Sequence, residues 1–231
     1  MKVGVLSDIH GNHYALKKVL ESARNEKVEK LLILGDLVGY YYHPEIVLSL
    51  ISEWDYDIIK GNHEIILQEL KENRLDSKEL KTKYGSGHEL ALKVIDNETL
   101  QWLFSLPSQK TVVIDNVSFQ MNHGSPSSTD EYVYPDAKTE QLEKCNSISH
   151  DFILIGHSHY SFSYKCNNSI LINCGSVGQS RQNGGLAYWT IINTDNKTFE
   201  TRVNPYDITE LLNEIKLIDP DFKYASEILQ R

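Results

Sequence analysis

Side chains that bind metal ions recur along this chain, and each group follows directly after a short apolar run. An aspartate and a histidine come first, then a second aspartate, then an asparagine, and further histidines stand in the second half. Glycines stand next to most of these groups and leave the backbone free to turn sharply beside an ion. The set consists of Asp8, His10, Asp36, Asn62, His123, His157 and His159.

These residue types suit a pair of adjacent divalent ions. Asp8 and His10 are two residues apart, so an extended backbone would point both side chains to the same side. Asp36 is the candidate bridge, because a carboxylate between two cations offsets their mutual repulsion. Asn62 offers a neutral amide oxygen, while imidazole nitrogens favour transition metals over calcium or magnesium. The residues therefore predict a site for transition-metal ions.

The elements that must position this set begin as an alternation of strands and helices. Residues 2–7 form an apolar run rich in β-branched side chains, which predicts a buried strand. Apolar residues between 15 and 23 recur at helical spacing and predict an amphipathic helix. The alternation continues with a strand at 31–34, a helix at 45–54 and a strand at 57–60. Such strands favour parallel pairing, with ligands bound outside their carboxyl ends, so the metal-binding side chains should converge there.

The remaining two thirds of the chain predict helices first and strands afterwards. Residues 64–106 lack strand signals and predict a helical insertion, and a hairpin with a tight turn at Asp115 and Asn116 follows. The later strands are expected at 152–155, 161–166, 170–173, 186–193 and 198–203, and the last helices at 208–218 and 222–229. The fold class is α/β, with two mixed β-sheets packed as a sandwich between flanking helices. We expect one domain over residues 1–231, with a helical insertion or lid at about 64–106 and C-terminal helices at about 206–230.

Composition narrows the classes of partner. The chain has 231 residues, of which 23 are Lys or Arg and 32 are Asp or Glu, so the formal net charge is −9. An acidic surface argues against broad nucleic-acid binding, and no apolar run is long enough to span a membrane. The apolar stretch that starts at Val3 runs directly into Asp8 and leaves no room for a signal peptide. The odd number of cysteines without CxxC spacing indicates a reducing compartment, so we expect a cytoplasmic protein.

The order of these motifs resembles a known family. DxH at Asp8, GD at Asp36, GNHE from Gly61, HG at His123 and GHxH from Gly156 follow the pattern of the calcineurin-like metallophosphoesterases. The strings SDIHGN and GSVGQ make the chain most similar to the small YfcE-type phosphodiesterases and to dinucleotide hydrolases of this superfamily. One departure is a serine at position 180, where many members carry proline before the arginine.

This resemblance implies two divalent transition-metal ions, with Mn²⁺ expected first and Fe, Zn, Ni or Co as alternatives. One ion would be held by Asp8, His10, Asp36 and His159, and the other by Asp36, Asn62, His123 and His157. Such a pair holds a bridging water, lowers its pKa toward neutrality and directs the hydroxide at phosphorus. The resemblance also implies that His63 stays off the metals, near the leaving oxygen, as a general acid or charge stabiliser.

Other residues near these motifs leave alternatives open. His63 has a second interpretation as a histidine that orients Asp36 or Asn62. Arg181 is either a bidentate phosphate clamp or a surface arginine of a loop. Tyr40 and its two neighbours either stack on a base or aryl group of the substrate or pack under the helical insertion. His13 is expected to cap the first helix or make a hydrogen bond beside the site, while the surface histidines are expected to be His43, His88 and His150.

The function expected from these observations is dinuclear-metal-dependent hydrolysis of phosphate esters by a phosphodiesterase or a nucleotide or dinucleoside polyphosphate hydrolase. The alternatives are a phosphomonoester phosphatase and a non-catalytic scaffold, since the fold also serves as a protein-binding subunit of the retromer complex. Because every ligand position is filled here, the scaffold is disfavoured, and the net charge of −9 disfavours a nuclease. The expected partner is a small phosphorylated substrate, and an apolar face on a C-terminal helix would allow a homo-oligomer.

Overall fold

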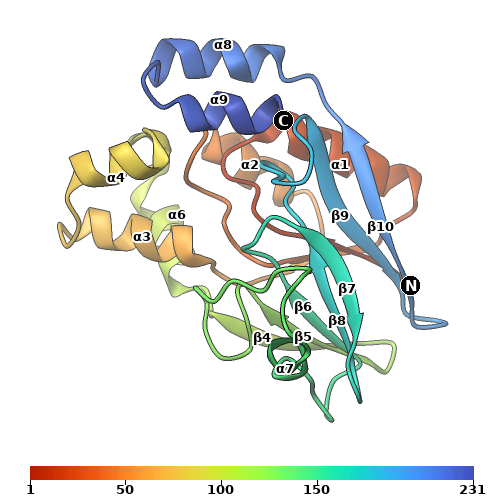
Figure 1. The fold of residues 1–231 in the computed structure, drawn as a ribbon. Helices are drawn as coiled ribbons and strands as arrows, with labels where there is room; N and C mark the ends of the chain where they lie inside the picture. Colours follow the sequence, from red (N-terminus) through yellow and green to blue (C-terminus); the bar gives the residue numbers. More distant parts are fainter.

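The N-terminal strand, β1, is the central strand of the first of two five-stranded sheets (Figure 1). The computed structural model describes all 231 residues. The strand order is β10-β9-β1-β2-β3, in which β1 pairs in parallel with β2 and β2 with β3, while β9 runs antiparallel to β1 and to β10. The strands of this sheet are β1 (Lys2–Leu6), β2 (Lys30–Ile33), β3 (Tyr56–Ile58), β9 (Leu186–Asn193) and β10 (Thr198–Pro205).

The second sheet is built from the middle of the chain, in the order β4-β5-β6-β8-β7. Its three inner strands are parallel, and each edge strand runs antiparallel to its neighbour. Asp115 and Asn116 join the first two strands with φ of 49° and 63°, as a tight hairpin turn requires. The strands are β4 (Gln109–Ile114), β5 (Val117–Asn122), β6 (Phe152–Ile155), β7 (Ser161–Lys165) and β8 (Ile170–Cys174).

Most of the helices cover the outer face of the first sheet. Helices α3, α4 and α6 lie together on the left of Figure 1, and α8 and α9 lie along its top. None of the helices is long and apolar enough to cross a membrane. The helices are α1 (His13–Asn25), α2 (Pro44–Ile51), α3 (Asn62–Lys71), α4 (Ser77–Tyr84), α5 (Gly87–Val94), α6 (Asn97–Ser105), α7 (Thr139–Glu143), α8 (Thr209–Ile218) and α9 (Lys223–Leu229).

Both faces of the central strands are buried, and their side chains alternate between two cores. Leu31 and Ile33 of β2 point into the core beneath the helices, whereas Leu32 points into the core between the two sheets. Phe119 and Phe152 of the second sheet close the inter-sheet core from the other side, with ring centroids 5.5 Å apart. Burial on both faces explains why β1 and β2 read as unbroken apolar runs in the sequence.

The α/β class and the two mixed sheets with flanking helices are confirmed. The strand bounds agree with the expected ones to within two residues, and Pro44 is the first residue of α2. Residues 62–105 hold four separate helices, and α7 was not anticipated because its five residues carry too short a pattern. The three cysteines are free.

Candidate metal centre

The loops that follow β1 and β2 are tied to each other by their backbones. Ile9 and His10 both donate their N–H groups to the carbonyl of Asp36, at 2.8 and 2.9 Å. Gly35 has a φ of 92°, and a Cβ at this position would lie 2.2 Å from the amide nitrogen of Gly61. Only glycine permits this approach, which brings the loop after β3 against the loop after β2. Three strand ends thereby meet at one point.

The metal-binding side chains come together at this point. His159 Nε2 lies 3.1 Å from Asp8 Oδ1, and His10 Nε2 lies 3.7 Å from the same oxygen. His123 Nε2 lies 3.2 Å from Asp36 Oδ2. Ligand atoms within 4.8 Å of one another define three overlapping groups, which are Asp8–His10–His159, His10–Asp36–His63 and Asp36–His123–His157.

Asn62 joins this arrangement through its side-chain oxygen, which lies 3.0 Å from His123 Nε2. Asn62 is also the first residue of α3, and the next residue, His63, donates its N–H to Asp36 Oδ1 at 2.8 Å. The N-terminus of a helix therefore faces the Asp36 carboxylate, which is a favourable place for negative charge. Every side chain of the metal-binding set lies in this one cluster.

The backbone of the site is not extended. Asp8 and His10 have φ of 55° and 53°, so the expected extended geometry between them is wrong, although the turn still directs both side chains to the site. Asp36, His157 and His159 share this left-handed conformation, with φ of 55°, 61° and 60°. Non-glycine residues rarely adopt it, and each instance costs about 1–3 kcal/mol. The rest of the fold sustains this strain at the residues of the site.

Backbone carbonyls fix the orientation of the imidazole rings. The Nδ1 atoms of His10, His123 and His159 lie 3.1, 2.7 and 2.6 Å from the carbonyls of Val38, Leu34 and Gln179. A carbonyl only accepts, so each Nδ1 carries the hydrogen, and in the neutral ring each Nε2 presents a lone pair to the site. This is how proteins orient histidines that bind metals.

The resulting set of lone-pair atoms suits the coordination of metal ions. His10 Nε2 and His159 Nε2 are 3.1 Å apart, so two lone pairs face each other unless a cation lies near both. Asp8 Oδ1 accepts no hydrogen bond, although His159 Nε2 is close to it. Buried His157 Nε2 has no hydrogen-bond partner either, and Asp130 Oδ1 lies 3.5 Å from it. Unpaired acceptors in a buried place are costly, and coordination of a cation satisfies them.

The site carries negative charge in the interior of the protein. Burial alone would raise the pKa of Asp8, but His159 and His10 lower it well below its usual range. The pKa of Asp36 is also lowered despite burial, through His123 and His63. Burial opposes charge on His123, yet Asp36 and Asp8 raise its pKa to about 10, so this ring would have to release a proton in order to bind a metal ion. Two ionised carboxylates among imidazoles form an attractive place for dications.

His63 lies beside the cluster and is 4% exposed. Its ring lies edge-on to that of His10, with centroids 4.7 Å apart, and its Nδ1 is 3.1 Å from Nε2 of His88. His88 is only 1% exposed, so its expected surface position is wrong. His13 does not cap the first helix as one alternative held, because Asn12 does so by accepting from Ala15 N–H.

Glu64, the last residue of the GNHE motif, is a further residue of the site, and the sequence alone predicts no role for it. Its buried carboxylate accepts hydrogen bonds from Asp36 N–H at 2.9 Å, Leu37 N–H at 2.7 Å and Gly61 N–H at 2.7 Å. Burial and the nearby Asp36 charge raise the pKa of Glu64, while these amides lower it. Glu64 thus holds the loops after β2 and β3 together.

Tyrosines of two kinds surround the cluster. Tyr40 is 6% exposed and packs against the rings of His10 and His63. Of the two alternatives, stacking on substrate and packing within the protein, its burial favours packing. The exposed tyrosines near the site are Tyr132, Tyr134 and Tyr224, which sequence reasoning did not single out. Arg181 is half-buried, and its backbone N–H donates a hydrogen bond to the carbonyl of His159.

Comparison with known proteins identifies the family. The calcineurin-like phosphoesterase superfamily domain matches residues 1–197. The uncharacterized protein MJ0912 of Methanocaldococcus jannaschii is 31% identical over 236 residues, which cover 92% of this chain and 91% of that protein. The hypothetical protein PH1004 of Pyrococcus horikoshii OT3 has a crystal structure with a TM-score of 0.84 at 20% identity, covering 100% of this chain and 98% of that one. A metallophosphoesterase from Sphaerobacter thermophilus gives a TM-score of 0.77 at 23% identity, with 94% of each chain covered.

The chain therefore belongs to the calcineurin-like phosphoesterase superfamily. It is a hydrolase that acts on phosphate esters, and its family works with divalent metal ions. The resemblance inferred from the order of the sequence motifs is confirmed.

Proposed function

We propose that the chain is a dinuclear-metal phosphodiesterase or a nucleotide or dinucleoside polyphosphate hydrolase. The observation that carries this proposal is the 3.1 Å separation of His10 Nε2 and His159 Nε2, two acceptors held together by backbone hydrogen bonds on their other nitrogens. We assign Asp8, His10, Asp36 and His159 to one ion. The second ion falls to Asp36, Asn62, His123 and His157.

When bound, two divalent ions supply a water nucleophile of lowered pKa and neutralise charge on the phosphoryl oxygens. The protein contributes the geometry. Asp36 stands between the two groups of ligands and holds its carboxylate against the first turn of α3. We assign His63, whose Nδ1 is engaged by His88, the role of donating a hydrogen bond to the leaving oxygen.

A small substrate and a transition metal complete the proposal. One structural neighbour supports the diester class, because it is described as an archaeal phosphodiesterase (TM-score 0.52). Another is described as the phosphoesterase YfcE from E. coli (TM-score 0.53) and supports phosphate esters in general. Imidazole-rich ligation favours Mn²⁺ or a related ion over magnesium. The three free cysteines agree with a reducing compartment, so we place the protein in the cytoplasm.

The test combines metal analysis with turnover of an aryl phosphodiester. Activity should disappear with a strong chelator and return with Mn²⁺. Asp36→Asn should lose bound metal and at least about 10³-fold in kcat, since one residue serves both ions. His63→Ala should keep its metal content and lose about 10²–10⁴-fold in kcat, as expected of a positioned proton donor.

Two outcomes would count against this assignment. Recovery with magnesium alone would contradict the histidine-rich ligand set. A wild-type kcat in His63→Ala would remove that residue from the mechanism while leaving the metal site in place.

A further inference from the structure

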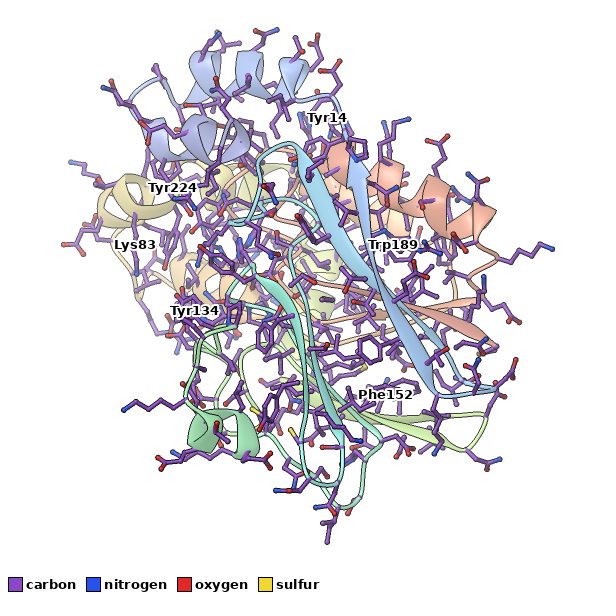
Figure 2. All side chains as sticks on the ribbon, turned by 45° about the vertical axis from the view of Figure 1, so that its right-hand side comes forward. Tyr14, Lys83, Tyr134, Phe152, Trp189 and Tyr224 are labelled. Carbon is purple, nitrogen blue, oxygen red and sulfur yellow. The ribbon has the colours of Figure 1, made fainter.

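Three exposed tyrosines form an aromatic surface next to the candidate metal centre. Tyr132, Tyr134 and Tyr224 are 39%, 38% and 36% exposed. Figure 2 shows Tyr224 and Tyr134 along the same side of the molecule, with Lys83 between them. Exposed aromatic side chains gathered beside a polar site are typical of ligand recognition.

Direct contacts connect this surface to the site. The ring of Tyr132 lies against that of His157, with centroids 4.0 Å apart, and Tyr134 lies parallel to Tyr132 at 5.6 Å with an interplanar angle of 5°. Tyr224 reaches the site from α9 through Tyr40, at 6.1 Å between centroids. The surface therefore begins at a candidate metal ligand and extends outward.

Arg181 lies among these tyrosines and gives the surface a positive charge beside Tyr132. Its guanidinium carbon is 5.9 Å from the centroid of Tyr132, and its Nε is buried without a hydrogen-bond partner. Burial lowers the pKa of Arg181, but the neighbouring hydroxyls of Tyr224, Tyr40 and Tyr132 raise it, so the group stays charged. A planar cation beside planar rings suits an anion that carries an aromatic group.

We propose that Tyr132 and Tyr134 bind a planar aromatic group of the substrate while Arg181 binds its phosphate. This inference rests on the proposed function, because it names the substrate class of the same site as aromatic phosphate esters, whether nucleosidyl or aryl. Alkyl esters lack the ring and gain nothing from the tyrosines. Stacking of one base on an aromatic side chain contributes about 1–3 kcal/mol, which corresponds to about 5- to 150-fold in affinity.

Binding of phosphonates tests this without requiring turnover. Phenylphosphonate, a nucleoside 5′-phosphonate and ethylphosphonate would be titrated calorimetrically into the Mn²⁺-loaded protein. We expect the aromatic ligands to bind about 10-fold more tightly than ethylphosphonate. Tyr134→Leu should reduce this ratio to about 2 or less, whereas Tyr134→Phe, which keeps the ring, should preserve it.

The outcomes separate this inference from the proposed function. Equal affinity for phenylphosphonate and ethylphosphonate in the wild type, or an unchanged ratio in Tyr134→Leu, would overturn the aromatic surface even if the enzyme hydrolyses diesters. Absence of hydrolysis alone would overturn only the proposed function. Tighter binding of the nucleoside 5′-phosphonate than of phenylphosphonate would identify nucleotides as the source of the aromatic group. Equal affinity for the two would mean that the surface accepts the aromatic group of any aryl ester.

A second, independent observation concerns the pair His63 and His88. His88 comes from α5, which lies outside the metal-binding loops, and the two ring planes are within 12° of parallel. The 3.1 Å contact joins Nδ1 of His63 to Nε2 of His88, while Nδ1 of His88 is buried without a partner. A buried N–H without an acceptor is rarer and costlier than an unpaired acceptor, so the hydrogen of His88 belongs on Nε2.

We infer that His88 is a positioning residue that fixes the tautomer of His63. Because His88 Nε2–H donates, His63 Nδ1 accepts, and the remaining hydrogen of His63 lies on Nε2. This tautomer makes His63 a hydrogen-bond donor toward the substrate. The inference goes beyond the proposed function, since the tautomer exists in the protein with or without substrate.

Nitrogen-15 spectra of the imidazole rings in the zinc-loaded protein test the tautomer directly. His63 should show an unprotonated Nδ1 and a protonated Nε2, and His88→Leu should abolish this preference. The same variant should lose about 10–100-fold in kcat, with KM within about threefold and unchanged metal content, as when an interaction made only in the transition state is removed. His88→Gln, which keeps a side-chain N–H, should recover much of this loss. A protonated Nδ1 on His63 in the wild type, or a wild-type kcat in His88→Leu, would overturn the inference.

Discussion

At the scale of single residues, the candidate metal ligands coincide with backbone strain. The left-handed residues Asp8, His10, Asp36, His157 and His159 are all members of the metal-binding set. Glycine is the residue that adopts this conformation without cost. The chain instead has aspartate and histidine there, the candidate metal ligands, at a conformational cost that a bound metal ion would offset by mass action.

A nearby residue allows a prediction about pH. His13 is 6% exposed, and burial, followed by His43 and Lys17, lowers its pKa to about 4, although Glu214 acts in the opposite direction. Between pH 6.5 and 4 the unfolded chain binds a proton at this residue and the folded chain does not. The contribution of His13 to the free energy of unfolding should therefore be fully present above pH 6.5. It should be lost as the pH falls toward 4, which lowers the free energy of unfolding by about 2–3 kcal/mol.

Substitution isolates this contribution from that of the carboxylates. His13→Gln should flatten the decrease in unfolding free energy between pH 6.5 and 4, measured by urea unfolding at several pH values. Identical pH profiles in the variant and the wild type would show that His13 does not titrate in this window.

The sequence was sufficient to predict that the candidate metal ligands come together, because each of them lies within the four residues after the end of a strand. His88 was misplaced, although a signal existed: His88, Ala91 and Ile95 are spaced as one helical face, and all three are buried. Tyr132 and Tyr224 carried no such signal. Their position beside the site depends on how a long loop and the last helix pack, which local patterns do not encode.

At the scale of elements, α3 performs two tasks with consecutive residues. Its first turn offers Asn62 and His63 to the site, and Glu64 turns back to bind the backbone of the neighbouring loops. The carboxylate of Glu64 is fully buried and satisfies amides from both loops. The placement of Asp36 thus depends on a helix that is distant from it in sequence.

Removal of this carboxylate should be severely destabilising. Glu64→Ala leaves several buried N–H groups without acceptors, each costing about 1–3 kcal/mol, so we expect a loss of about 3 kcal/mol or more in unfolding free energy. Metal content should decrease as well, because Asp36 loses its support. Urea unfolding and metal analysis measure the two effects.

A matched control lies at the other end of the same helix. Glu72 follows α3 and is exposed, so Glu72→Ala should change the unfolding free energy by no more than about 0.5 kcal/mol. Equal effects of the two substitutions would mean that the buried hydrogen bonds of Glu64 are not special.

At the scale of the whole molecule, the C-terminal helices reach the loops of the first sheet that surround the site. Helices α8 and α9 lie beyond residues 1–197, the part that matches the family, yet α9 carries Tyr224. The hydroxyl of Tyr41 donates to the carbonyl of Ala225 at 3.3 Å, which fixes α9 over the loop that follows Asp36. The C-terminal helices thus complete the surroundings of a centre that the family domain begins.

Asp219, at the junction of α8 and α9, holds this arrangement together. Its carboxylate is 4% exposed and accepts from Tyr42 Oη–H at 3.1 Å, Ser86 N–H at 2.8 Å and Ser86 Oγ–H at 2.5 Å. These bonds connect the C-terminal helices to the loop between β2 and α2, which contains Tyr42, and to the turn between α4 and α5. One side chain therefore couples three segments that lie far apart in the sequence.

Asp219→Ala should consequently loosen the molecule at all three places. We expect a loss of about 2–4 kcal/mol in unfolding free energy, because the Ser86 and Tyr42 donors remain buried without an acceptor. Hydrogen exchange should accelerate in α9 and at the start of α5 together, which separates a shared junction from local fraying of the C-terminus. Asp221→Ala, two residues away and exposed, should leave exchange in both helices unchanged. Faster exchange in α9 without faster exchange in α5 would show that the junction does not couple the two helices.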